Sequence, residues 1–279
     1  MTPDKLSLLR LTEIKRRGEK IVMVTAYDAP SARLADAQGI DLLLVGDSAA
    51  MVVMGHESTV PVTLDEMVML TAAVARGSRR ALVVGDLPFG SYQPSDEVAV
   101  SSAVRMVKDG GADLVKLEGS ERRLSRVRAI VDAGIPVMGH IGLTPQSATM
   151  LGGFKTQGKT AEAARQLLAD AHALEDAGCC SLVLEAIPAP VAAKITRELR
   201  IPTIGIGAGP ECDGQVLVYH DLLGLTEGHI PRFVKRYANL SREIRDALEA
   251  YASEVRSGAF PGEEHTYAMS EAELDAFTT

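Results

Sequence analysis

Acidic residues end several apolar segments of this sequence. Asp47 and Asp86 each follow a short apolar run and a glycine, and Glu118 and Glu185 end two further runs. A single acidic residue at such a position is commonly a helix N-cap or a solvated loop residue. Several carboxylates packed together, however, either retain a proton or surround a cation. Because oxygen ligands select hard ions, Mg²⁺ is the expected cation, with Mn²⁺ as a substitute.

A lysine and a histidine share this context. Lys116 alternates with Val115 and Leu117, so its side chain is expected to point to the face opposite theirs. A lysine directed into the protein interior needs an anionic partner, which is either one of the acids or a substrate carboxylate. An internal salt bridge without a ligand is the alternative. His140 ends another apolar run, where a hydrogen-bonded structural histidine is the common case.

The segments that would hold these residues repeat along the chain. In each repeat a helix end and a glycine precede an apolar strand that finishes in a polar residue, and the glycine fits a left-handed C′ cap. Continuous apolar strands are typical of a parallel sheet that helices cover. The expected strands are 21–26, 40–48, 81–86, 112–119, 135–141, 179–186 and 202–207, with 216–220 as a weaker eighth.

Helix signals separate these strands. Thr63 and Glu66 form a capping box, and Ser95 and Thr160 can cap two further helices. The alternation predicts an α/β fold, either a (β/α)8 TIM barrel or a doubly wound open sheet. Because polar residues end most of the strands, as if facing one shared mouth, we favour the barrel.

The whole chain is expected to form one barrel domain. It has 279 residues, and a TIM barrel takes about 250. The barrel, with an N-terminal amphipathic helix, is expected over residues 1–267, and residues 268–279 form a C-terminal tail with a short acidic helix. The net charge of −8 argues against a nucleic-acid partner. No apolar run has the length of a membrane span or of a secretory signal, and the three cysteines suggest no disulfide framework, so a cytoplasmic protein is expected.

Two glycine-rich segments could contact a ligand. Residues 205–209 resemble a phosphate-binding turn, but the third glycine of GxGxxG is missing and Pro210 follows, so a dinucleotide site is not supported. Residues 151–158 are either a mobile lid, with Lys155 steering anions, or an ordinary flexible loop.

Several longer segments together resemble the ketopantoate hydroxymethyltransferase family. Among them are LLLVGDSAAMVVMGHESTVPVTLDEM, VVGDLPFGSY, DLVKLEGS, PVMGHIGLTPQS and LVLEAIP, and the resemblance runs in order from about residue 6 to residue 267. The strings HIGLTPQS and GHESTVPVT are highly specific to this family. The resemblance implies a (β/α)8 barrel of the phosphoenolpyruvate/pyruvate superfamily and a homo-oligomer, a decamer built as a pentamer of dimers.

The resemblance also implies an activity and residue roles. The activity is transfer of a hydroxymethyl group from methylenetetrahydrofolate to 2-oxoisovalerate (3-methyl-2-oxobutanoate), which gives ketopantoate through a Mg²⁺-stabilised enolate in pantothenate biosynthesis. By motif position, the metal residues are Asp47, Asp86 and Glu118, the substrate residues are Asp47, Ser48, Asp86, Lys116 and His140, and the catalytic base is Glu185.

The sequence departs from the family pattern at two places. Ala49-Ala50 follow VGDS, where Leu-Gly is expected, and Gly90-Ser91 follow DLPF, where Met-Ser or Met-Ala is common. Both changes put the pocket shape in doubt and spare the charged groups. No folate pocket is evident, with Lys155 as a weak candidate contact.

Two other functions remain as alternatives. A related Mg²⁺-dependent lyase or mutase for 2-oxo acids would share the acidic residues but generally carries a loop cysteine, and none follows the glycines of 151–158. A non-catalytic scaffold barrel is disfavoured because uncompensated acids at the strand ends would destabilise it.

Overall fold

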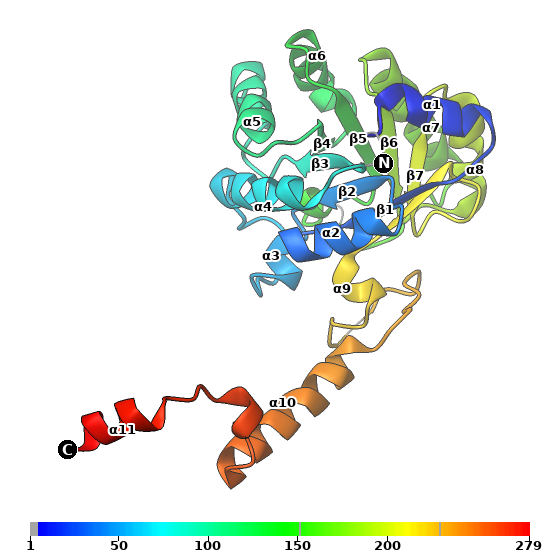
Figure 1. Cartoon of the computed structure of the whole chain (residues 1–279). Coiled ribbons are helices and arrows are strands. Elements are labelled where there is room, and N and C mark those ends of the chain that lie inside the picture. Colours follow the sequence, from blue (N-terminus) through cyan, green and yellow to red (C-terminus); the bar gives the residue numbers. More distant parts are fainter. Residues whose placement is uncertain (1–4, 151, 229) are drawn as a thin grey trace.

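The strands of the chain close into a barrel. The computed structural model describes residues 5–150, 152–228 and 230–279. In these residues eight parallel strands pair in sequence order around the barrel (Figure 1), and β8 closes it by pairing with β1. The (β/α)8 barrel is thereby confirmed, and the doubly wound open sheet is excluded. The strands are β1 (Ile21–Thr25), β2 (Leu42–Val45), β3 (Leu82–Asp86), β4 (Leu114–Glu118), β5 (Val137–Gly142), β6 (Ser181–Glu185), β7 (Thr203–Ile206) and β8 (Gly214–Leu217).

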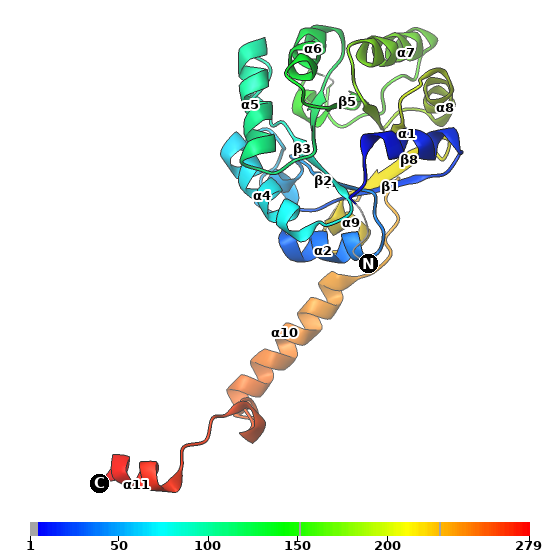
Figure 2. The same ribbon diagram turned by 45° about the horizontal axis from the view of Figure 1, so that its top comes forward.

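Helices surround the barrel (Figure 2). The predicted caps are confirmed: Thr63 forms the capping box with Glu66, and the side chains of Ser95 and Thr160 accept from backbone N–H groups. The helices around the barrel are α1 (Leu8–Arg16), α2 (Ala29–Ala37), α4 (Leu64–Gly77), α5 (Asp96–Lys108), α6 (Leu124–Asp132), α7 (Ala161–Asp176) and α8 (Ala189–Glu198), and the short helices are α3 (Ala49–Val52) and α9 (Tyr219–Leu222).

Alternation along each strand divides the core into two clusters. Residues such as Val83 and Val115 pack outward against the helices, whereas Val84 and Leu114 fill the barrel interior, where Leu11 of α1 also packs. Every second residue of a strand points to the same side, so residues two or four positions after Val84 and Leu114 also point into the barrel. Polar side chains at those positions therefore face the barrel mouth.

The eighth strand begins two residues earlier than the sequence predicts. It spans Gly214–Leu217, and Tyr219 and His220 open helix α9 in place of ending the strand. A Cβ atom at Gly214 would lie 2.5 Å from the carbonyl oxygen of Ile21, so close packing against β1 requires glycine there. Glycine has a low strand propensity, which is why the apolar run alone misplaces this strand.

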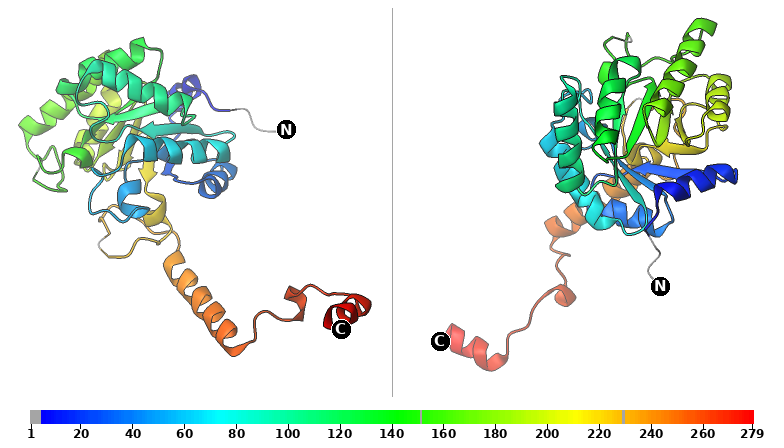
Figure 3. Two further views of the ribbon diagram at one scale, coloured as in Figure 1. Left: turned by 90° about the vertical axis from the view of Figure 1, so that its left-hand side faces the viewer. Right: turned by 90° about the horizontal axis from the view of Figure 1, so that it is seen from above.

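The C-terminal region leaves the barrel. Helix α10 (Leu240–Ser257) projects away from it, and the short acidic helix expected in the tail is α11 (Glu271–Thr278) (Figures 1 and 3). The domain boundary between residues 267 and 268 stays a prediction. In the described part of the chain, no helix combines the length and the apolar character needed to cross a bilayer.

Candidate active site

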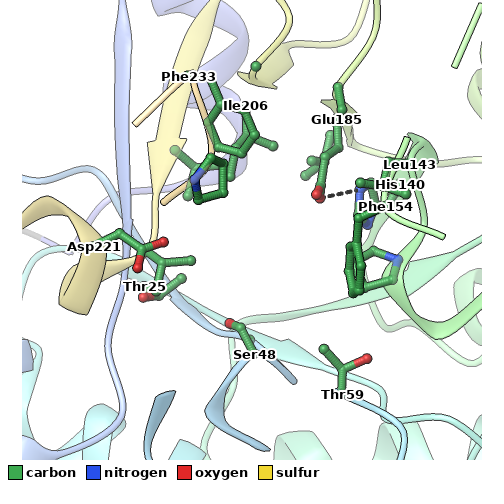
Figure 4. Close-up of a pocket in the computed structure, with 18 of the residues that line it drawn as sticks. Thr25, Ser48, Thr59, His140, Leu143, Phe154, Glu185, Ile206, Asp221 and Phe233 are labelled. Carbon is green, nitrogen blue, oxygen red and sulfur yellow. Dashed lines mark ion pairs between the residues drawn. The ribbon is translucent and has the colours of Figure 1, made fainter. Parts of the chain in front are cut away.

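A cavity of about 1180 Å³ opens at the C-terminal ends of the strands, where TIM barrels hold their active sites (Figure 4). All of the side chains that the sequence singles out as a site line this one cavity. They are Asp47, Ser48, Asp86, Lys116, Glu118, His140 and Glu185. The grouping of these residues is therefore a property of the fold, whereas their individual roles remain predictions.

Four neighbouring strands bring the charged groups into contact. Nζ of Lys116 lies 2.9 Å from Oδ1 of Asp86 and 3.4 Å from Nδ1 of His140. Nδ1 of His140 also lies 3.4 Å from Oε1 of Glu118, and its Nε2 lies 3.2 Å from Oε2 of Glu185 (Figure 4). The register explains this chain of contacts, because Asp86 on β3 is paired with Lys116 on β4 and Glu118 is paired with His140 on β5.

Lys116 and His140, the two cationic side chains in this row of contacts, stay protonated at neutral pH. Burial and the charge of Lys116 act to lower the pKa of His140, but contacts with Glu118 and Glu185 outweigh them and raise it to about 9. Burial also acts to lower the pKa of Lys116. The negative charges of Asp86 and its neighbours outweigh this effect and raise the pKa above its ordinary value. His140 is consequently an imidazolium that links the buried Glu118 to Glu185, which is closer to solvent.

The acidic groups outnumber these cations. Burial, together with the charges of Asp86 and Glu118, raises the pKa of Asp47 well above its ordinary value, and burial raises that of Asp86 despite Lys116. When all are ionised, the carboxylates of Asp47, Asp86, Glu118 and Glu185 carry two negative charges more than Lys116 and His140, the cations in contact with them, can compensate. Retained protons or a divalent cation would balance the site.

The donor set fits Mg²⁺ bound by few protein ligands. Oδ1 of Asp86 and Oε1 of Glu118 are buried oxygens whose contacts are the two cationic side chains, Lys116 at 2.9 Å and His140 at 3.4 Å, so each has a lone pair left for a cation or its water shell. In the described residues, however, no three His, Cys, Asp or Glu side chains converge as a direct metal-binding group. Mg²⁺ usually keeps several waters and contacts one or two carboxylates. The acids match this mode better than a shell of three direct ligands.

A buried glutamine, Gln146, organises the acids and was missed by the sequence analysis. Its Nε2 donates to Oδ2 of Asp47 and to the Leu87 carbonyl, each at 3.0 Å, and its backbone N–H donates to Oε2 of Glu118 at 3.0 Å. The hydroxyl of Tyr92 donates to Oε1 of Gln146 at 2.6 Å. Gln146 lies in the family string HIGLTPQS, but an uncharged loop residue offers no chemical reason to be chosen from the sequence.

Replacing Gln146 with alanine is expected to lower turnover by about 10- to 100-fold, a range typical of partners that orient metal or catalytic ligands. Asp47 would lose the donor that orients its carboxylate. The isosteric Gln146→Glu variant should be at least as impaired, because it places an acceptor against Asp47 without changing the side-chain volume. Steady-state kinetics measure both effects, with Gln166→Ala on the exposed side of α7 as the control. Wild-type turnover in Gln146→Glu would contradict the orienting role.

Two hydroxyl groups also face the cavity. Oγ of Ser48 lies 2.9 Å from the hydroxyl of Tyr27, whose pKa burial raises above its ordinary value, so Tyr27 remains a proton donor. Oγ1 of Thr59 is buried without a hydrogen-bond partner and lies at the cavity wall (Figure 4). Thr59 lies in the string GHESTVPVT, and it too was missed as a site residue.

The departures from the family pattern lie outside the lining of the cavity. Ala49 and Ala50 are fully buried in α3, directly after Ser48. Gly90 adopts a φ of +90°, a conformation that favours glycine, and the hydroxyl of Ser91 donates to the Pro88 carbonyl at 2.7 Å. Among the described residues that line the cavity, none of these four is present. Their influence on pocket shape is thus indirect.

The two glycine-rich segments both reach the cavity. Gly207 and Gly209 line it from the turn after β7, and Phe154 and Lys155 line it from the segment predicted as a lid. Leu151, the first residue of that segment, lies outside the described residues. Lid movement itself stays a prediction.

Comparison with known proteins gives consistent matches over nearly the whole chain. The sequence profile of the ketopantoate hydroxymethyltransferase family matches residues 5–263. A 3-methyl-2-oxobutanoate hydroxymethyltransferase from Thermobifida fusca is 58% identical over 264 residues, which are 95% of this chain and 94% of that protein. The enzyme of the same name from Moorella thermoacetica is 59% identical over 264 residues, or 95% of this chain and 98% of that protein.

More distant solved structures share the fold. A 2,3-dimethylmalate lyase superposes with a TM-score of 0.60 at 18% identity, covering 97% of this chain and 98% of that one. Phosphoenolpyruvate phosphomutase from Streptomyces platensis subsp. rosaceus superposes with a TM-score of 0.61 at 16% identity, covering 98% of this chain and 97% of that one. At these identities the likeness extends to the barrel alone.

Proposed function

This chain belongs to the ketopantoate hydroxymethyltransferase family, and we propose that it transfers a hydroxymethyl group from methylenetetrahydrofolate to 3-methyl-2-oxobutanoate, giving ketopantoate. The observation that carries the proposal is the Glu185 carboxylate, which borders the cavity and contacts an imidazolium that the buried Glu118 holds in place. A carboxylate of this kind is suited to remove a proton next to a carbonyl group.

The substrate would be held by charge and by a hydroxyl group. Lys116 supplies the positive charge for the substrate carboxylate, and the Ser48 hydroxyl donates a hydrogen bond to it. Tyr27 can support this role, because its hydroxyl stays protonated, and donation from it to Oγ of Ser48 would leave the Ser48 proton free for the substrate. The apolar side chains of Leu44, Val183 and Val216 line the cavity and suit the branched end of the substrate.

Glu185 would take the proton from C3 of the substrate, and the electron pair would pass into an enolate. His140 and Lys116 place positive charge beside the acids as negative charge develops on the substrate. Bound Mg²⁺ would supply Lewis-acid stabilisation of that charge. The nucleophilic carbon then forms a C–C bond with the methylene carbon of the folate. One of the two C–N bonds at that carbon breaks as the C–C bond forms, and water supplies the hydroxyl oxygen as the second C–N bond breaks. The proton taken by Glu185 and one proton of the water pass to the two folate nitrogens, and tetrahydrofolate leaves.

Deuterium exchange tests this proposal directly. The protein is incubated with 3-methyl-2-oxobutanoate, Mg²⁺ and D2O, and loss of the C3 proton signal is followed by NMR. Exchange is expected without folate, and adding methylenetetrahydrofolate should yield ketopantoate. Absence of exchange with every divalent metal tested would refute enolate formation. Exchange without ketopantoate formation would favour the lyase or mutase alternative.

Mg²⁺ is expected to stabilise the protein more strongly as pH rises. Because the pKa values of Asp47 and Asp86 are raised on folding, these groups stabilise the metal-free fold below about pH 4 and lose that contribution as pH rises through their folded values. A divalent cation replaces the retained protons. Thermal unfolding at about pH 5 and about pH 8 should therefore give a larger Mg²⁺-induced rise in Tm at the higher pH, with KCl at equal ionic strength as the control. A rise that does not depend on pH would contradict proton–metal exchange at these acids.

We also propose a cytoplasmic homo-oligomer, with the decamer as the expected assembly. The three cysteines are free, which suits a reducing compartment. Helix α10 has no buried residue and exposes Ile244, Leu248, Tyr251 and Val255 at the spacing of one helix face. An apolar face of this kind is suited to contact a second copy. Sedimentation velocity of the full chain measures the assembly, and a monomer at all concentrations would exclude it.

A further inference from the structure

We propose that the outer part of the cavity binds the one-carbon donor, with its flat ring system against Phe154 and Phe233 and its anionic tail toward Lys155 and Arg232. The loop after β5 carries the first aromatic–cation pair, and the segment between α9 and α10 carries the second. The inference rests on the proposed function in one respect, that the donor is a reduced folate. It assigns to the folate a pocket of which the sequence suggests only Lys155.

The cavity is large enough for a second ligand beside the 2-oxo acid. Pockets of about 300–1000 Å³ hold drug-sized molecules. The cavity of about 1180 Å³ exceeds that range, whereas the 2-oxo acid is a short branched molecule that occupies only the region near Lys116 and Glu185. The remaining volume is sufficient for a folate-sized co-substrate.

The aromatic side chains have the exposure of a binding surface and not of a core. Phe154 is 59% exposed and Phe233 is 37% exposed, although both line the cavity. Figure 4 places them on different sides of the cavity, with Glu185 between them in that view. The Phe233 ring also packs on the backbone of Gly207, where an added Cβ would lie 2.6 Å from the ring. A flat conjugated ring is the ligand chemistry that such aromatic faces recognise.

Charge fixes the orientation of the donor. The inner end of the cavity carries Asp47, Asp86, Glu118 and Glu185, which repel the carboxylates of a folate tail. Lys155 and Arg232 lie beside the two phenylalanines in sequence, and both are exposed and line the cavity. The tail is therefore directed outward to these cations, and the reactive end of the ring system is directed inward to the substrate.

Binding measurements on the full-length protein test this site. Tetrahydrofolate affinity is measured by calorimetry for Phe154→Ala and Phe233→Ala, with Phe277→Ala in α11 as the matched control. Each cavity variant should bind about tenfold more weakly or worse, on the scale of base–aromatic stacking. Lys155→Gln and Arg232→Gln should weaken binding of the triglutamate form more than that of the monoglutamate form, with Lys159→Gln as the control.

Folate-independent deuterium exchange separates this inference from the proposed function. Phe154→Ala and Phe233→Ala should exchange the C3 proton of the 2-oxo acid at the wild-type rate, which also establishes that the variants are folded. Unchanged tetrahydrofolate affinity in both variants, or loss of exchange in both, would overturn the donor site. Failure of the wild-type protein to exchange or to transfer would instead overturn the proposed function.

Discussion

Replacing Glu185 with glutamine is expected to slow deuterium exchange at C3 of the 2-oxo acid by about 10²- to 10⁴-fold, the usual contribution of a positioned general base. The amide keeps the size of the side chain but lacks a basic oxygen to accept the proton. Because Glu185 contacts only the outer nitrogen of His140, the contacts of Lys116 with Asp86 and His140 should persist. Mg²⁺ binding should therefore be retained, which calorimetry can verify alongside the NMR exchange rate.

Two further variants make this result specific. Glu162→Gln, on the first turn of α7, is the surface control and should exchange at the wild-type rate. Glu118→Gln removes the buried acid on the other side of His140 and should disturb both substrate binding and exchange. Exchange that persists in Glu185→Gln and vanishes only in Glu118→Gln would identify Glu118 as the base.

The charged residues of the site could be predicted because strand ends are visible in the sequence. Asp86, Glu118 and Glu185 each end a strand, and the barrel brings the ends of four neighbouring strands together. The direction of the Lys116 side chain could also be predicted, because Lys116 lies two residues after Leu114 and therefore points to the same, interior side of the strand. Periodicity and chemistry together were sufficient for these positions, although they assign no roles.

Other parts of the site depend on contacts that no local pattern encodes. Gln146 donates three hydrogen bonds, one from its backbone N–H and two from Nε2, and a short 3₁₀ turn positions them. Thr59 is identified only by its buried hydroxyl, which has no hydrogen-bond partner. Phe154 and Phe233 lie on loops far apart in sequence, so their shared cavity requires the folded barrel. The start of β8 was misplaced because a close backbone approach at Gly214, and not strand propensity, determines it.

Replacing Lys116 with methionine is expected to lower the free energy of unfolding by about 3–5 kcal/mol in metal-free buffer, the usual cost of removing one partner of a buried ion pair. Methionine fills a similar volume but leaves Asp86, at 2.9 Å in the wild type, without its ammonium partner. Turnover should also fall, because the substrate carboxylate loses its counter-charge.

The pH dependence of this loss distinguishes charge from packing. At low pH, protons retained by Asp47 and Asp86 replace the missing positive charge, since burial raises the pKa of both carboxyl groups. The destabilisation should therefore be smaller at about pH 5 than at about pH 8, and Mg²⁺ should reduce it at the higher pH. Urea unfolding at fixed protein concentration measures it, with Lys108→Met on the exposed end of α5 as the control. Equal destabilisation at both pH values would mean that the aliphatic packing of Lys116, and not its charge, supports the acidic site.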